Sequence, residues 1–248
     1  MTQAIERPGA DAPVVNRPQK ANRPWIVEFA SSAVGKKWIM ALSGLGLIGF
    51  VIAHAFGNLK MYFGPDDFDH YAESLRTLFY PIIPRTWTLW GMRIGLVVLF
   101  VAHIGSAISL TRMNQHARPT KYASPRSYIA ANFASRTMRW TGIIVALYLV
   151  FHLADLTWGF ANPDFVRGDA YDNLVASFER VPVAIIYIVS NIALGIHLFH
   201  GAWSMFQSMG INSPRYNGAR RAIAAGVAGA ITIVNVSFPL AVLFGIVG

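Results

Sequence analysis

Long apolar runs separated by polar segments dominate the chain. Five runs reach the roughly 20 residues that an α-helix needs to cross a bilayer at about 1.5 Å per residue. They are Trp38–Leu59, Trp87–Leu110, Thr137–Phe160, Pro182–Phe206 and Ala222–Val247. The run from Ile39 to His54 is apolar all round and holds small residues that let neighbouring helices approach closely. The pattern predicts an all-α integral membrane bundle of five transmembrane helices.

The segment before the first run has a different character. Residues 1–35 are mostly polar, contain prolines and lack the apolar core of a signal peptide. We expect a polar cytoplasmic tail over residues 1–35, with a short helix near Trp25–Phe29, and one five-helix transmembrane domain over residues 36–248. Because the number of spans is odd, the two ends of the chain lie on opposite sides of the membrane.

Composition supports the membrane class and limits the chemistry. Hydrophobic residues make up 54% of the chain and charged residues 13%, about half the charged share of a soluble domain. The sequence has no cysteine, which excludes disulfides, iron–sulfur ligation, thiolate ligation of haem and covalent haem attachment. Any chemistry that needs such groups would therefore belong to partner subunits.

The placement of charge predicts the orientation. The net charge is +9, and most of the 21 basic residues fall in the tail or in the connections on the same side of the membrane as the tail. Of the 12 acidic residues, only Glu6, Asp11 and Glu28 lie on that side. The positive-inside rule then puts the N-terminus in the cytoplasm. The location we expect is the inner (plasma) membrane. We read the basic excess as topology and a docking surface, with no nucleic-acid partner.

Four histidines recur at matching positions in four consecutive spans. His54, His103, His152 and His197 each lie 15 or 16 residues after the start of their span, which is about 22–24 Å along a helix. Consecutive spans run in opposite directions. His54 and His152 should therefore form an outer layer, and His103 and His197 an inner layer, roughly 15 Å apart.

Two neutral imidazoles from facing helices are the ligands of a six-coordinate haem b. Zinc usually takes a third or fourth ligand, and proton relays use chains of Asp, Glu and His. The pattern favours two stacked haems, with His54 and His152 on the outer iron and His103 and His197 on the inner iron. The alternatives are packing contacts between polar groups and a haem-free proton or ion transporter.

The same segments resemble a known family. Gly49-Phe-Val-Ile-Ala-His-Ala-Phe-Gly-Asn-Leu-Lys-Met-Tyr-Phe-Gly64 resembles the first helix of the diheme (b558-type) cytochrome b subunit of succinate dehydrogenase. Tyr148-Leu-Val-Phe-His-Leu-Ala-Asp-Leu-Thr-Trp-Gly159 resembles its third helix. His197-Leu-Phe-His-Gly-Ala-Trp203, followed by Met209-Gly-Ile, resembles its fourth. The resemblance covers about residues 35–248 and includes the number of spans and the histidine placement.

The resemblance implies a membrane anchor for a flavoprotein subunit and an iron–sulfur subunit on the cytoplasmic side. It implies two haem b groups that pass electrons from succinate to a quinone, with menaquinone expected. The four axial positions carry over to His54, His103, His152 and His197. His200 competes with His197 for the fourth position, and we favour His197. Within the class, the anchor of a fumarate reductase or of another quinone-linked oxidoreductase remains an alternative.

Further polar residues near the predicted haem layers are candidates for supporting roles. Arg93 is expected to bind a haem propionate, or else to pair with Asp155 or extend to the interface. Ser43 is expected to bond a propionate or its own helix. Glu73, Asp155 and His200 are candidates for handling quinone protons. For Glu73, solvated surface charge is the alternative.

Overall fold

The computed structural model describes residues 24–117, 133–211 and 213–248. Within these ranges, five helices are long and apolar enough to cross a membrane. They are α2 (Ala33–Asn58), α4 (Trp87–His116), α5 (Phe133–Leu156), α7 (Val181–Ser208) and α8 (Asn217–Leu243). The five predicted spans are thus confirmed. The third ends earlier than predicted, at Leu156, and the second continues to His116.

Short helices lie before the first span and in the connections between spans. They are α1 (Trp25–Ser31), the 3-10 helix η1 (Leu59–Phe63), α3 (Pro65–Arg76), α6 (Ala170–Glu179) and the 3-10 helix η2 (Pro214–Tyr216). The expected helix near Trp25 is confirmed as α1, whereas residues 1–23 of the predicted tail lie outside the described residues. The sequence reading did not predict α6.

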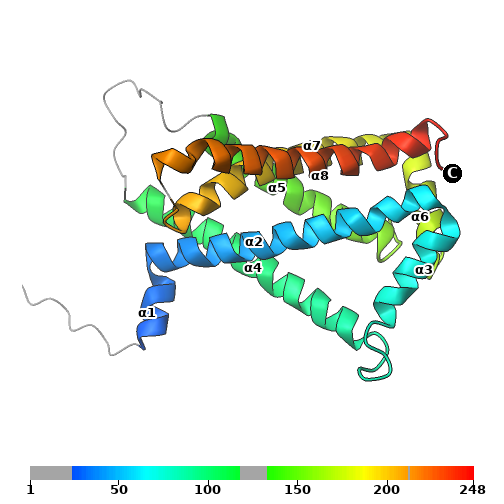
Figure 1. The fold of residues 1–248 in the computed structure, drawn as a ribbon, viewed down its shortest axis with the longest axis horizontal. Helices are drawn as coiled ribbons and strands as arrows, with labels where there is room; N and C mark the ends of the chain where they lie inside the picture. Colours follow the sequence, from blue (N-terminus) through cyan, green and yellow to red (C-terminus); the bar gives the residue numbers. More distant parts are fainter. Residues whose placement is uncertain (1–23, 118–132, 212) are drawn as a thin grey trace, which may run out of the picture.

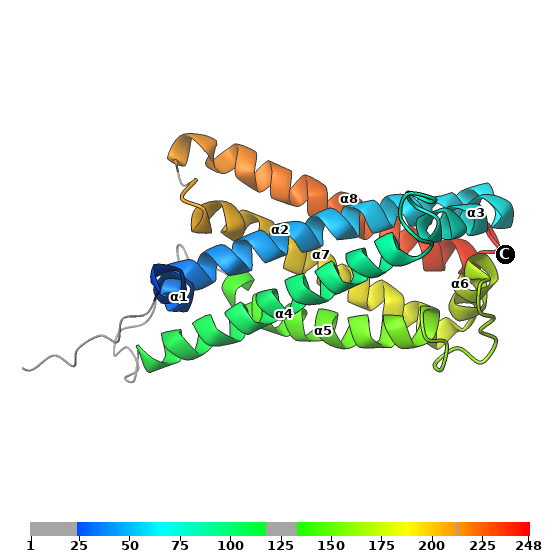
Figure 2. The ribbon, with the colours of Figure 1, turned by 90° about the horizontal axis from the view of Figure 1, so that it is seen from below.

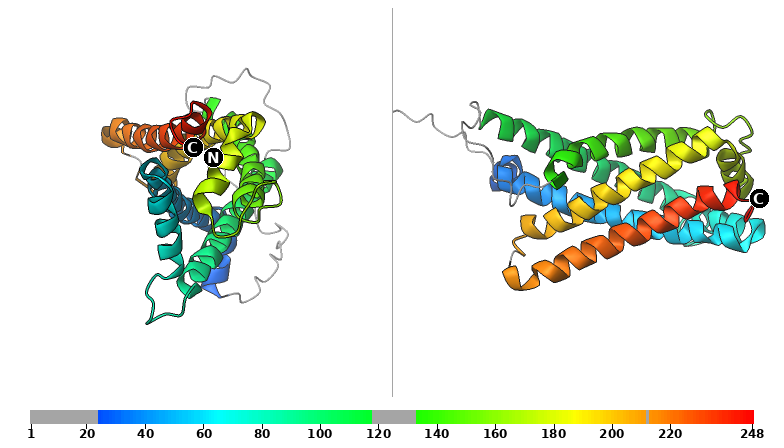
Figure 3. Two further views of the ribbon diagram at one scale, coloured as in Figure 1. Left: turned by 90° about the vertical axis from the view of Figure 1, so that its right-hand side faces the viewer. Right: turned by 90° about the horizontal axis from the view of Figure 1, so that it is seen from above.

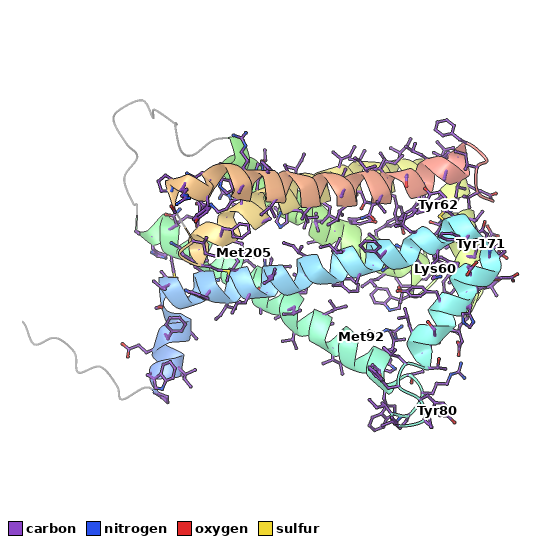
Figure 4. The ribbon with its side chains drawn as sticks, in the orientation of Figure 1. Lys60, Tyr62, Tyr80, Met92, Tyr171 and Met205 are labelled. Carbon is purple, nitrogen blue, oxygen red and sulfur yellow. The ribbon has the colours of Figure 1, made fainter. Side chains whose placement is uncertain are left out.

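The five long helices alternate in direction, and α3 and α6 lie together at one end of the bundle (Figures 1 and 2). We call this the α3/α6 end, and the opposite end, which carries α1 and η2, the α1 end. Figure 4 shows Lys60, Tyr62 and Tyr171 at the α3/α6 end and Met205 near the α1 end. The end-on view in Figure 3 shows the C-terminus beside α6, which contacts α8.

Local sequence explains where several helices begin. The hydroxyl of Ser32 accepts a hydrogen bond from the Gly35 N–H at 3.0 Å and caps α2. Pro65 occupies the first turn of α3, where its missing N–H is harmless. The Asp69 carboxylate of α3 accepts bonds from the N–H groups of Ala170 and Tyr171, at 2.8 and 3.1 Å. This contact joins α3 to the N-terminus of α6.

The long helices pack against one another in particular pairs. Close backbone contacts join α2 to α4 and α7, and join α7 to α5 and α8. The largest buried apolar cluster lies at the α3/α6 end, where Phe68, Phe178, Tyr187 and Phe238 meet. The pairs α2/α5 and α4/α7 are not among the helices with extensive backbone contact within the described residues. These two pairs are the ones that carry the predicted histidine couples.

Candidate functional site

The structure brings the four recurrent histidines together in two pairs. The ring centroids of His54 (α2) and His152 (α5) are 5.9 Å apart, with an interplanar angle of 80°. Those of His103 (α4) and His197 (α7) are 6.3 Å apart, at 72°. We call His54 and His152 the first pair, and His103 and His197 the second pair. The pairing expected from alternating helix direction is therefore present.

The two pairs lie at different levels of the bundle. The first pair is near the α3/α6 end, because His54 and His152 fall in the last turns of α2 and α5. His103 contacts α2 at Ser43 and Gly44, ten or eleven residues before His54. At 1.5 Å per residue the two levels are therefore about 15 Å apart, as the sequence predicts.

Hydrogen bonds orient the second pair. Nδ1 of His103 lies 3.2 Å from the Met40 carbonyl and 3.5 Å from the Ser43 hydroxyl. A carbonyl only accepts, so Nδ1 carries the proton and Nε2 keeps its lone pair. Nδ1 of His197 lies 3.4 Å from Oγ1 of Thr141.

The partner of His197 fixes the same tautomer. The Thr141 hydroxyl donates to the Thr137 carbonyl at 2.9 Å, so its oxygen accepts from His197. Both rings of the second pair therefore present an unprotonated Nε2. This is the arrangement of metal-binding histidines, whose other ring nitrogen donates to a neighbouring group.

A glycine lies against each imidazole of the second pair. A Cβ at Gly44 would lie 3.2 Å from Cε1 of His103, and a Cβ at Gly142 would lie 3.3 Å from Cε1 of His197. These contacts are tight, so the absence of a side chain lets each ring lie close to the facing backbone.

The two environments repeat in the sequence. Met40-Ala-Leu-Ser-Gly44 on α2 corresponds to Met138-Arg-Trp-Thr-Gly142 on α5, and a histidine of the first pair follows ten residues after each glycine. The sequence analysis missed Thr141 and Gly142. The repeated Met-x-x-Ser/Thr-Gly pattern was the signal that could have identified them.

The first pair has a more polar surrounding. Nδ1 of His152 lies 3.3 Å from the Tyr187 hydroxyl, which also lies 2.9 Å from Oδ2 of Asp155. The ring of His54 stacks on Phe50 with centroids 5.4 Å apart. Tyr187 lies on α7, and the sequence analysis missed it because no motif marks it.

Asp155 is fully buried and paired with Arg180. Its Oδ1 lies 2.5 Å from Nη2 of Arg180, and the Ser177 hydroxyl donates to Oδ2. The alternative pair of Arg93 with Asp155 is therefore wrong. Arg180 begins the turn into α7 and reaches Asp155 from α6, an element that the sequence did not reveal.

Arg93 lies elsewhere, on the exposed side of α4. Its guanidinium lies over the ring of Trp90 at 5.1 Å, a cation–π contact. Both residues line a cavity of about 390 Å³ near the α3/α6 end, together with Arg76 and Arg167. The expected link from Arg93 to a haem propionate stays a prediction.

Glu73, at the same end, is held by two arginines. Arg76 donates to it at 3.0 Å, and Arg85 donates to its other oxygen. The Arg76 and Arg85 guanidinium groups hold the pKa of this carboxyl below its usual value. Reduction of a quinone takes up protons, and a carboxyl with a lowered pKa is ionised and has none to give, so the pairing disfavours Glu73 as a proton donor to quinone.

Ser43 and His200 complete the candidate residues. The Ser43 hydroxyl donates to the Ile39 carbonyl at 2.6 Å, the expected bond within its own helix, and also faces His103. Nδ1 of His200 and Nε1 of Trp203, one turn apart on α7, are buried and without a hydrogen-bond partner in the described part of the chain. His200 does not take the place of His197 in the second pair.

Two further observations concern metal and nucleotide motifs. Among the described residues, no group of three or more His, Cys, Asp or Glu side chains gathers to hold a metal ion. The stretch Gly44-Leu-Gly-Leu-Ile-Gly49 has the spacing of a dinucleotide fingerprint, but it lies in the middle of α2. That fingerprint requires a strand before it and a helix starting at it, so this stretch is not a nucleotide site.

The helices and paired imidazoles define a class of multi-pass membrane protein with intramembrane histidine sites. A family model described as succinate dehydrogenase/fumarate reductase transmembrane subunit matches residues 114–236, just under half of the chain. The match supports placing the chain among these membrane subunits. A search of the curated proteins and a search of the solved structures give no match.

Proposed function

We propose that this chain is the cytochrome b anchor of a succinate dehydrogenase. It would bind two b haems, one at each histidine pair, and pass electrons from an iron–sulfur subunit to a quinone, with menaquinone expected. The observation that carries the proposal is the occurrence of two imidazole pairs, at 5.9 and 6.3 Å, within apolar helices.

The ring spacing fits a metal between the imidazoles. Metal–imidazole bonds are about 2.0–2.1 Å long, so two rings on opposite sides of one metal have centroids roughly 6 Å apart. Three of the four histidines are half-buried and His54 is exposed, so each keeps accessible surface. The lone pair on Nε2 of His103 and His197 supplies the required donor.

The residues of the chain then have distinct tasks. His54 and His152 would hold the first haem, and His103 and His197 the second. Bound haem iron supplies one-electron redox chemistry. The helices set the levels about 15 Å apart along the membrane normal, and the apolar side chains exclude water from the space between them.

Orientation and partners follow from charge. The α1 end carries Lys36, Lys37 and Arg221, so the positive-inside rule assigns it to the cytoplasmic side of the membrane, which would be the inner (plasma) membrane. The flavoprotein and iron–sulfur subunits would dock there. The first pair would then be the outer one. His200 and Asp155 would be the candidates for handling quinone protons, since Arg76 and Arg85 disfavour Glu73.

Purification of the full complex tests this proposal. We expect two haems per anchor chain in a pyridine haemochrome assay and b-type absorption bands that succinate reduces. A colourless anchor would refute the proposal in favour of a haem-free transporter. Rates of succinate oxidation and fumarate reduction, compared with the same quinone pool, separate the dehydrogenase from a fumarate reductase.

A further inference from the structure

Tyr187 connects His152 to a buried carboxylate. Its hydroxyl lies 2.9 Å from Oδ2 of Asp155 and 3.3 Å from Nδ1 of His152. Asp155 has no exposed surface and pairs with Arg180 at 2.5 Å. An ionised carboxylate only accepts, so the phenol donates its proton to Asp155 and accepts from Nδ1–H of His152.

The ion pair holds this chain of bonds in place. Ser177 and Arg180, at the end of α6 and just beyond it, approach Asp155 from one side, while Tyr187 approaches it from α7. The Tyr187 ring is buried between Phe178 and Phe151. The hydroxyl therefore has a fixed position beside His152.

The second pair lacks such a charged group among the described residues. His103 and His197 are oriented by the Met40 carbonyl and the hydroxyls of Ser43 and Thr141, all of which are neutral. The two pairs thus differ in the groups that are hydrogen-bonded to their imidazoles, although their ring spacings are nearly equal.

We propose that Tyr187 and Asp155 are positioning residues for His152, which fix its tautomer and ring orientation and increase its strength as a ligand. This inference rests on the proposed function, because it concerns the haem at the first pair. A group that accepts from Nδ1–H increases the basicity of the imidazole, and such outer partners change metal affinity by about 10–100-fold. A more basic ligand favours oxidised iron, so the contact lowers the reduction potential of that haem.

Tyr187→Phe is the test, because it removes the hydroxyl and keeps the packed ring. Tyr148→Phe is the matched control. Tyr148 also packs against the His152 ring, with centroids 5.8 Å apart, but its hydroxyl accepts from Asn191. Both variants are measured in the intact complex by redox titration of each haem and by electron paramagnetic resonance. The haem that is missing in His54→Ala identifies the first pair.

We expect Tyr187→Phe to raise the reduction potential of the first-pair haem and to shift its ferric resonance. The ratio of reduced to oxidised haem at fixed potential should rise by up to about tenfold, which for one electron is about 59 mV. The second haem and the Tyr148→Phe protein should be unchanged. Asp155→Asn should shift the same haem in the same direction, and it serves as the test if Tyr187→Phe does not assemble.

Some outcomes would refute the positioning role of Tyr187, and a different one would refute the proposed function. An unchanged first haem in a Tyr187→Phe complex with two haems refutes the positioning role. Equal shifts in Tyr187→Phe and Tyr148→Phe, or shifts of both haems, show a general packing effect and also refute it. A wild-type complex without haem refutes the proposed function instead.

Discussion

Haem counts in double variants provide the sharpest test of the histidine pairs. Each single change, such as His54→Ala, removes one of the two proposed haem ligands of one pair. The remaining ring cannot be rescued by the other pair, because the two levels lie about 15 Å apart along the helices while the rings within a pair are 5.9 or 6.3 Å apart. Each single variant should therefore fall from two haems to one.

The double variants test this geometry through the number of haems that each one retains. His54→Ala with His152→Ala removes both ligands of the same pair, so one haem should remain. His54→Ala with His103→Ala removes a ligand from each pair, so no haem should remain. The counts are measured by pyridine haemochrome against protein concentration in purified complexes.

The result that refutes the reasoning is the reverse pattern. One haem retained in His54→Ala with His103→Ala, and none in His54→Ala with His152→Ala, would mean that the irons are bound between other helices. Loss of both haems in every single variant, with the complex still assembled, would contradict two independent sites.

Three further changes have defined outcomes. A Cβ at Gly195 would clash with Oγ1 of Thr232, so Gly195→Val should destabilise the contact of α7 with α8 by about 1–3 kcal/mol. The melting temperature in detergent should fall, and an unaltered melting temperature would contradict this prediction. Arg180→Ala leaves Asp155 buried without its ion partner and should cost about 3–5 kcal/mol, whereas Arg180→Ala with Asp155→Ala should cost less in the same melting assay. His200→Ala should keep two haems, and loss of one would assign ligation to His200.

Periodicity and helix length predicted the spans and the histidine pairs because both depend on the spacing of residues along a regular helix. A regular rise converts residue number into depth, so His54 and His152 could be paired from the sequence. The partners of Asp155 could not, because Arg180 and Ser177 belong to α6 and its end. That helix is only ten residues long and its position depends on tertiary contacts, such as the cap from Asp69.

The repeated Met-x-x-Ser/Thr-Gly pattern of α2 and α5 is visible in the sequence, but its relation to the histidines could not be inferred before the contacts were known. Ser43 and Thr141 are small hydroxyl residues in apolar helices, which usually bond to their own backbone, and both do so. Only the packed structure shows that each also faces a histidine of the second pair. The alternative pairing of Arg93 with Asp155 failed because Asp155 pairs with Arg180 instead, and side-chain reach cannot be read from depth along a helix alone.

Each histidine couple draws one ring from the first half of the chain and one from the second. His54 and His103 come from α2 and α4, and His152 and His197 come from α5 and α7. A chain synthesised only as far as α4 would therefore contain one histidine of each pair and no complete pair. If the pairs hold haem iron as proposed, neither iron could gain both of its ligands before α5 and α7 are made, and each bound iron would then link the early half of the chain to the late half.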